Sequence, residues 1–225
     1  MIKTLYHGSS DIIKKPKYGY GKKYNDYGLG FYCTDSIEMA KEWGVGFNQN
    51  GYANCYELDC TGLSILNLND PKYCILHWLA VLLKNREFES ASALAAEAKE
   101  YLLKNFSVDY ETYDAIIGYR ADDSYFSFAQ DFINGTISYR QLNNAMHLGR
   151  LGQQFVLKSE IAFEKINFTG YEIADYDIWY QKKIIRDKTA RREYFDAERN
   201  KRQRGDIYMM QILDEEMKAD DLRLR

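Results

Sequence analysis

The amino-acid sequence predicts an α+β fold followed by a charged helical extension. Short runs rich in aromatic and β-branched residues, typical of strands, are interleaved with longer segments whose apolar residues recur at helical spacing. With 46% hydrophobic and 28% charged residues, the 225-residue chain has the composition of a globular protein. The composition changes near Glu172, so we expect one domain over residues 1–170 and a mostly helical extension over residues 171–225.

The predicted strands are alternating or continuously apolar runs bounded by turn residues. They are residues 2–6, 31–33, 54–59, 63–68, 113–120 and 153–159, and the apolar run 161–163 continues the last of them. Helical spacing of apolar residues predicts helices over residues 73–85, 90–105, 125–134 and 139–148. In the extension, residues 182–204 contain ten Lys or Arg against four Asp or Glu, which is typical of a helix with a mostly solvated face.

Two N-terminal segments have glycine where the backbone must turn or approach another group. The first strand ends at His7-Gly8-Ser9, where Gly8 leaves backbone N–H and C=O groups accessible to a ligand. Residues 26–34 contain two glycines and lead through a short strand to a capped helix. This strand–helix arrangement brings Tyr32 and Trp43 within reach of one cleft.

Three further features admit both a functional and a structural explanation. Residues 11–27 are rich in lysine, glycine and tyrosine, which predicts a long surface loop that either binds a pyrophosphate or is simply solvated. Arg120 ends a buried-type strand, where it either contacts a ligand or forms a salt bridge within the turn. Gln154 begins another such strand, a position at which glutamine is commonly only a polar edge residue.

Charge, cysteine and histidine content and the lack of long apolar runs bear on the partners and sites to expect. The formal net charge of −3 gives no argument for binding to nucleic acid or to an anionic membrane. The four cysteines lack Cys-x-x-Cys spacing and the three histidines are far apart, so we expect no metal site. The chain has no secretory leader and no run of about 20 apolar residues, which predicts a cytoplasmic protein with reduced thiols and no membrane partner.

Three separated segments together resemble the strand motifs of the ADP-ribosyltransferase superfamily, in the branch with a His-Tyr-Glu triad. They are Tyr6-His7-Gly8-Ser9, Gly28-Leu29-Gly30-Phe31-Tyr32 with Trp43 downstream, and Gln154-Phe155-Val156. The sequence is most similar to a bacterial family of ADP-ribosyltransferase-like domains, in which a Tyr-Asp string followed by hydrophobic residues and glycine recurs between them. The resemblance spans about residues 2 to 168 and implies a split β-sheet core with surrounding helices.

Carried over by position, the resemblance gives each motif residue a role in binding NAD. It implies that His7 hydrogen-bonds the adenine-side ribose and that the Gly8 backbone pairs with the nicotinamide carboxamide, with Ser9 beside it. It also implies that Tyr32 stacks on the nicotinamide ring and that Trp43 covers the other face of that ring.

Gln154 occupies the position at which many members have the catalytic glutamate. Cleavage of the bond between nicotinamide and ribose builds positive charge on the ribose, as in glycoside cleavage. Glutamine keeps a hydrogen-bond acceptor but has no charge and no useful basicity. We therefore expect His7, Tyr32 and Gln154 to support at most mono-ADP-ribosylation of an acceptor that is already nucleophilic, with Arg120 as a further NAD contact.

The resemblance thus predicts an enzyme that uses NAD as a substrate and transfers ADP-ribose to a macromolecular acceptor, either protein or nucleic acid. Related bacterial domains are often associated with toxin–antitoxin or phage-defence systems, which implies a small antitoxin-like partner protein. Two alternatives stay open at this point, an inert NAD- or partner-binding module and an NAD glycohydrolase. Gln154 favours the binding module, whereas intact His7, Tyr32 and Trp43 favour the transferase.

Overall fold

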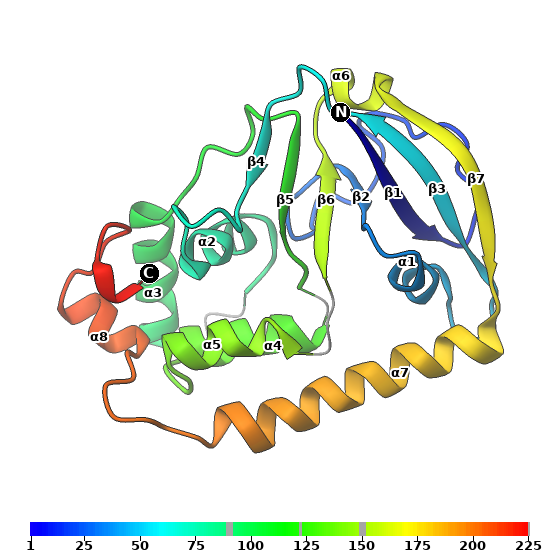
Figure 1. Cartoon of the computed structure of the whole chain (residues 1–225). Helices are drawn as coiled ribbons and strands as arrows, with labels where there is room; N and C mark the ends of the chain where they lie inside the picture. Colours follow the sequence, from blue (N-terminus) through cyan, green and yellow to red (C-terminus); the bar gives the residue numbers. More distant parts are fainter. Residues whose placement is uncertain (89–91, 122, 149–151, 225) are drawn as a thin grey trace.

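The computed structural model describes residues 1–88, 92–121, 123–148 and 152–224, which form mixed α+β structure with two β-sheets (Figure 1). The strands are β1 (Ile2–Ser9), β2 (Phe31–Cys33), β3 (Gly51–Asp59), β4 (Ile65–Asn67), β5 (Ala115–Tyr119), β6 (Gln153–Leu157) and β7 (Ile166–Ala174). The helices are α1 (Ile37–Gly44), α2 (Ile75–Asn85), α3 (Ala93–Asn105), α4 (Asp123–Ile133), α5 (Tyr139–Ala145), α6 (Glu160–Glu164), α7 (Tyr176–Glu193) and α8 (Met209–Asp214). The predicted α+β class is confirmed.

The two sheets are joined at one short junction. One sheet has the antiparallel order β1-β3-β7, and the other has the order β2-β6-β5-β4, with β4 and β5 parallel. Between them, Tyr6 and Thr34 exchange two backbone hydrogen bonds of 2.8 and 2.9 Å. This junction places the end of β1 beside β2, whose other neighbour is β6.

Helices cover the four-stranded sheet and α7 spans the molecule. In Figure 1, α2 to α5 and α8 gather near the four-stranded sheet, α1 lies below β1 and β3, and α7 runs beneath both sheets. The main core buries Trp78, Phe128 and Phe132 among these helices, and a second core includes Leu5 and Leu157. Within the described chain, no helix has the length and apolar character that a membrane crossing requires.

Strand β7 and the C-terminal end tie the extension to the rest of the chain. The sequence did not predict β7, which continues through residue 170, the predicted domain boundary, and pairs with β3 along its length. The extension contains the predicted helices, α7 and α8. Beyond α7, Met209, Ile212 and Leu224 are fully buried in the main core. Side chains of the extension therefore contribute directly to the hydrophobic core.

Helix-capping residues explain two differences between the predicted and the observed elements. The run 161–163 is not strand but part of α6, because the Ser159 hydroxyl accepts a hydrogen bond from the Ala162 N–H and starts a helix there. The helix predicted over residues 90–105 begins at Ala93 after the Ser92 cap, and residues 90 and 91 lie outside the described part. The capped helix that the sequence predicts after residues 26–34, with Asp35 or Ser36 as its cap, is α1, and its N-cap is Ser36.

Replacing Gly118 tests the packing of β5 under the cavity. A Cβ atom at Gly118 would overlap the hydroxyl of Tyr27, a fully buried side chain whose O–H donates to the Tyr119 carbonyl at 2.6 Å. Gly118→Ala should therefore lower the free energy of unfolding by about 1–3 kcal/mol in urea titrations. Gly46→Ala is the matched control, because the nearest atom to its added Cβ lies at 3.5 Å. Equal stabilities of the two variants would contradict this packing.

Candidate functional site

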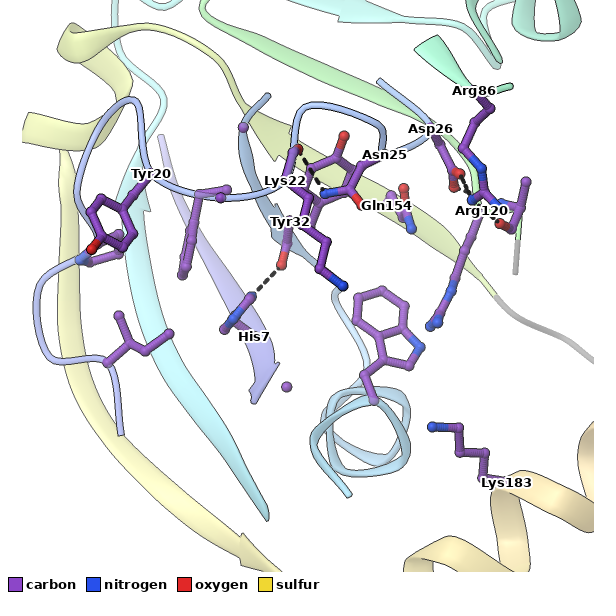
Figure 2. A pocket seen from close by; sticks show the side chains of 18 of the residues that line it. His7, Tyr20, Lys22, Asn25, Asp26, Tyr32, Arg86, Arg120, Gln154 and Lys183 are labelled. Atoms are coloured by element: carbon purple, nitrogen blue, oxygen red, sulfur yellow. Dashed lines mark hydrogen bonds and ion pairs between the residues drawn. The ribbon is translucent and has the colours of Figure 1, made fainter. Parts of the chain in front are cut away.

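Residues from three separated strands line one cavity of about 1100 Å³. Figure 2 shows His7, Tyr32 and Gln154, which come from β1, β2 and β6, around this space. Six of the seven site residues selected from the sequence contribute to its lining, namely His7, Gly8, Tyr32, Trp43, Arg120 and Gln154. Ser9 does not line the cavity, since its hydroxyl donates to the Asp11 carbonyl at 2.5 Å and accepts from the Asn54 side chain at 3.0 Å.

Strand register places Tyr32 and Gln154 on the same face of the four-stranded sheet. Tyr32 lies opposite Val156, and Gln154 is two residues from Val156 on the same strand. The Gln154 side chain is buried, and its Oε1 has no hydrogen-bond partner within the described residues. An unsatisfied buried acceptor costs about 1–3 kcal/mol, so the Gln154 amide would gain a hydrogen bond from a ligand if it rotated to turn this oxygen toward the cavity.

His7 is held as a neutral imidazole with a defined tautomer. Its Nδ1 lies 2.7 Å from the backbone oxygen of Tyr32, which can only accept, so Nδ1 carries the proton and Nε2 keeps a lone pair. The ring stacks on Phe31 with a centroid separation of 4.4 Å. Burial lowers the pKa of His7 below its usual value of 6.5, against the opposing effect of the Tyr32 hydrogen bond. At neutral pH His7 therefore offers a hydrogen-bond acceptor.

Gly8 is required by the packing of α1 against β1. Because Tyr6 directs its N–H and C=O toward Thr34, the alternation along a strand directs those of Gly8 to the same edge, beyond the end of β2. A Cβ atom at Gly8 would overlap the Ala40 carbonyl of α1. The sequence explained this glycine by ligand access alone, and the structure adds the close approach of α1.

The turn before β2 borders the cavity at Gly30 and is held by side-chain hydrogen bonds. The Tyr32 hydroxyl donates to the Gly28 carbonyl at 2.5 Å and accepts from the Tyr27 N–H at 3.1 Å. The Lys158 ammonium donates to the carbonyls of Tyr27 and Leu29, each at 2.6 Å. Burial lowers the pKa of Lys158 and raises the pKa of Tyr32. Lys158 was not selected from the sequence, and it lies outside the lining of this cavity.

Asp26 connects the loop to the ends of α2 and β5. Its carboxylate pairs with Arg86 at 2.9 Å and accepts from the Ala121 N–H at 2.8 Å. Burial raises the pKa of Asp26, and the Ala121 hydrogen bond and the arginines oppose that shift. Both Asp26 and Arg86 line the cavity, and neither was selected from the sequence.

Trp43 and Arg120 form a pair at the cavity wall. The Arg120 guanidinium carbon lies 4.1 Å from the centroid of the Trp43 ring, so it covers one face of the indole. The Trp43 Nε1 is buried without a hydrogen-bond partner in the described part of the chain. The resemblance assigned one face of Trp43 to nicotinamide, and Arg120 restricts that role to the face it leaves uncovered.

The cavity is strongly cationic, which the net charge of the chain does not suggest. Nine cationic side chains line it against two carboxylates, Asp26 and Asp187, and the nine are Lys14, Lys15, Lys17, Lys22, Arg86, Arg120, Lys183, Arg186 and Arg191. The last three come from α7, to which the sequence assigned a mostly solvated face. Figure 2 shows Lys22, Arg120 and Lys183 ending in the same central space. No cluster of three or more metal-ligating side chains occurs among the described residues.

Comparison with known proteins identifies a family for most of the chain. A family model described as "Protein of unknown function (DUF3990)" matches residues 3–168. The matched segment runs from β1 into β7 and contains His7, Tyr32 and Gln154. No curated protein and no solved structure matches the chain. Because the family model covers well over half of the sequence, the chain belongs to the DUF3990 family.

Proposed function

We propose that the cavity binds NAD and that the protein is a mono-ADP-ribosyltransferase acting on a macromolecule. The observation that supports this most directly is the convergence of His7, Tyr32 and Gln154, the three residues carried over from the ADP-ribosyltransferase motifs, on one cavity. The division of the strands into two sheets joined beside that cavity supports an ADP-ribosyltransferase-like fold. The toxin or defence role and an antitoxin-like partner rest on the resemblance alone.

In the proposed complex each part of NAD meets chemically matched groups. The nicotinamide carboxamide, a donor and an acceptor, pairs with the exposed backbone edge of Gly8, and its ring stacks on Tyr32. The Nε2 lone pair of His7 accepts a hydrogen bond from the adenine-side ribose. The pyrophosphate lies among the cations, where Lys22 and Arg120 end in the central space (Figure 2).

Gln154 then acts where charge develops. As the bond between ribose C1′ and the nicotinamide nitrogen breaks, its electron pair leaves with nicotinamide and positive charge builds on the ribose. The buried Oε1 of Gln154 accepts from a ribose hydroxyl and directs the negative end of its dipole toward that charge. An amide cannot remove a proton from the acceptor, which supports a single transfer to an existing nucleophile rather than chain elongation.

The amide at position 154 also supports a second candidate, a module that binds NAD or a partner without turnover. NAD glycohydrolysis is the third. Nicotinamide release and the fate of labelled ADP-ribose separate the three, because transfer gives labelled macromolecule, hydrolysis gives free ADP-ribose and inert binding gives neither.

Substitution of Tyr32 tests the nicotinamide position. Removing a stacking ring costs about 1–3 kcal/mol, so Tyr32→Ala should weaken NAD binding roughly 5- to 150-fold in titration calorimetry. Tyr32→Phe keeps the ring and should retain most of the affinity, although it loses the hydroxyl contacts to the preceding turn. If the folded Tyr32→Ala variant binds NAD with unchanged affinity, Tyr32 does not contact NAD.

Substitution of Gln154 tests the catalytic role. Gln154→Ala should lower the rate of nicotinamide release about 100-fold while changing the Kd for NAD little, because the contact strengthens as charge develops. Gln154→Glu should raise the rate, since a carboxylate stabilises the cationic ribose more strongly than an amide does. If release survives Gln154→Ala at the original rate, the residue is only structural.

The neutral state of His7 predicts a pH dependence of binding. Only neutral His7 accepts a hydrogen bond at Nε2, and burial lowers its pKa below 6.5. The affinity for NAD should therefore be constant from about pH 8 to 6.5 and should fall as the pH drops through the lowered pKa. His7→Gln should remove this fall, whereas His147→Gln should preserve it, because exposed His147 lies outside the cavity lining. A midpoint above 6.5 would contradict the assignment.

A further inference from the structure

We propose that the acceptor is a single-stranded nucleic acid, bound by residues 14–24 and by the cationic side of α7 at the mouth of the cavity. This inference rests on the proposed transferase function and names the chemical class of its second substrate. Four observations carry it: the sequence of the loop, the exposure of its rings, the excess of positive charge and the size of the cavity.

The loop between β1 and β2 alternates cations with exposed aromatic rings. Residues 14–24 read Lys-Lys-Pro-Lys-Tyr-Gly-Tyr-Gly-Lys-Lys-Tyr. The side chains of Tyr18, Tyr20 and Tyr24 are 52%, 77% and 71% exposed, and Tyr18 also packs edge-on against Phe163. Tyr18 and Tyr24 lie outside the cavity lining. Proteins that hold single strands combine such stacking rings with a cationic track for the phosphates. Tyr20 itself lines the cavity, so a base stacked on it would lie next to the NAD site.

The charge of the cavity exceeds what NAD requires. The pyrophosphate of NAD carries two negative charges, whereas nine cations line the cavity. Three of them are paired with carboxylates: Arg86 with Asp26, Arg186 with Glu42, and Arg191 with Asp187. The loop lysines Lys14, Lys15, Lys17 and Lys22 make no ion pair with the described residues. A strand with one charge per nucleotide would supply their counter-charges.

The cavity is large for a small-molecule site and open to solvent. Its volume of about 1100 Å³ exceeds the roughly 300–1000 Å³ of typical small-molecule sites. The loop lysines bound it on one side and Lys183, Arg186 and Arg191 of α7 on the other. A single strand can enter between these two cationic walls, whereas a duplex keeps its bases stacked and unavailable to the tyrosines.

The chemistry at Gln154 requires an acceptor with an available lone pair. Unprotonated ring nitrogens of the bases and the oxygens of a terminal phosphate both meet this condition. The lone pair forms the new bond to ribose C1′ while the bond from C1′ to nicotinamide breaks and its electrons leave with nicotinamide. No proton has to move to the protein, which suits an amide in place of a carboxylate.

Fluorescence anisotropy with a short RNA strand tests the binding surface without NAD. A single strand of about 12 nucleotides should bind at least tenfold more tightly than its duplex. Tyr20→Ala should weaken binding roughly 5- to 150-fold, and Lys22→Ala should reduce the salt slope by about 0.7. Tyr171→Ala and Lys104→Ala are matched controls, because both residues are exposed and lie outside the cavity lining. Equal binding of strand and duplex, or equal effects of controls and cavity variants, would overturn the proposal.

The acceptor role is tested with NAD labelled in its adenylate group. Wild-type protein should label the strand. Tyr24→Ala removes an exposed ring of the same loop that lies outside the cavity lining, so it should reduce this labelling at least fivefold while leaving nicotinamide release in the absence of RNA unchanged. A strand without its terminal phosphate separates the two nucleophiles, since retained labelling indicates a base and lost labelling indicates the phosphate. Nicotinamide release with label only on added protein would overturn the inference and leave the transferase intact. Absence of nicotinamide release under all conditions would overturn the proposed function itself.

Discussion

The junction between the two sheets brings together the three strand residues of the candidate site, His7, Tyr32 and Gln154. Tyr6 and Thr34 exchange backbone hydrogen bonds, and the next residue of β1, His7, donates its Nδ1–H to the Tyr32 carbonyl at 2.7 Å. These contacts cross the boundary between a three-stranded and a four-stranded sheet. The pairing of β2 with β6 then brings in Gln154. Without the junction the imidazole would belong to a different surface from the tyrosine and the glutamine.

Two sides of the cavity differ in their hydrogen bonding and charge. The turn at residues 27–30, of which Gly30 lines the cavity, is held by hydrogen bonds from Lys158 and Tyr32. Residues 14–24 and α7 instead present cations and exposed rings. The first side suits the reacting end of a dinucleotide, which must be held in a defined geometry. The second suits a flexible polyanion, which is attracted by charge and stacks without a fixed sequence.

The sequence predicted the strand residues that line the candidate site better than it predicted the elements around them. His7, Tyr32 and Gln154 each stand in a short sequence motif that resembles an ADP-ribosyltransferase motif. That resemblance predicted that the three residues would line one cavity. The cations that α7 adds to the cavity lining were not predicted. Apolar residues in the extension have no regular helical spacing, so its charged residues were interpreted as a solvent-exposed helix face. Strand β7 was missed because it is an edge strand that exposes much of its length and contains Gly170. The run 161–163 was misread because apolar content cannot reveal that the Ser159 hydroxyl caps a helix there.

The central claim is that one dinucleotide contacts strands β1, β2 and β6 at once. A crystal structure of the protein with NAD tests it most directly. We expect the nicotinamide ring against Tyr32, its carboxamide on the Gly8 backbone and a ribose hydroxyl at the Gln154 Oε1. NAD bound elsewhere, or density for NAD that leaves the Gln154 side chain without a contact, would contradict it.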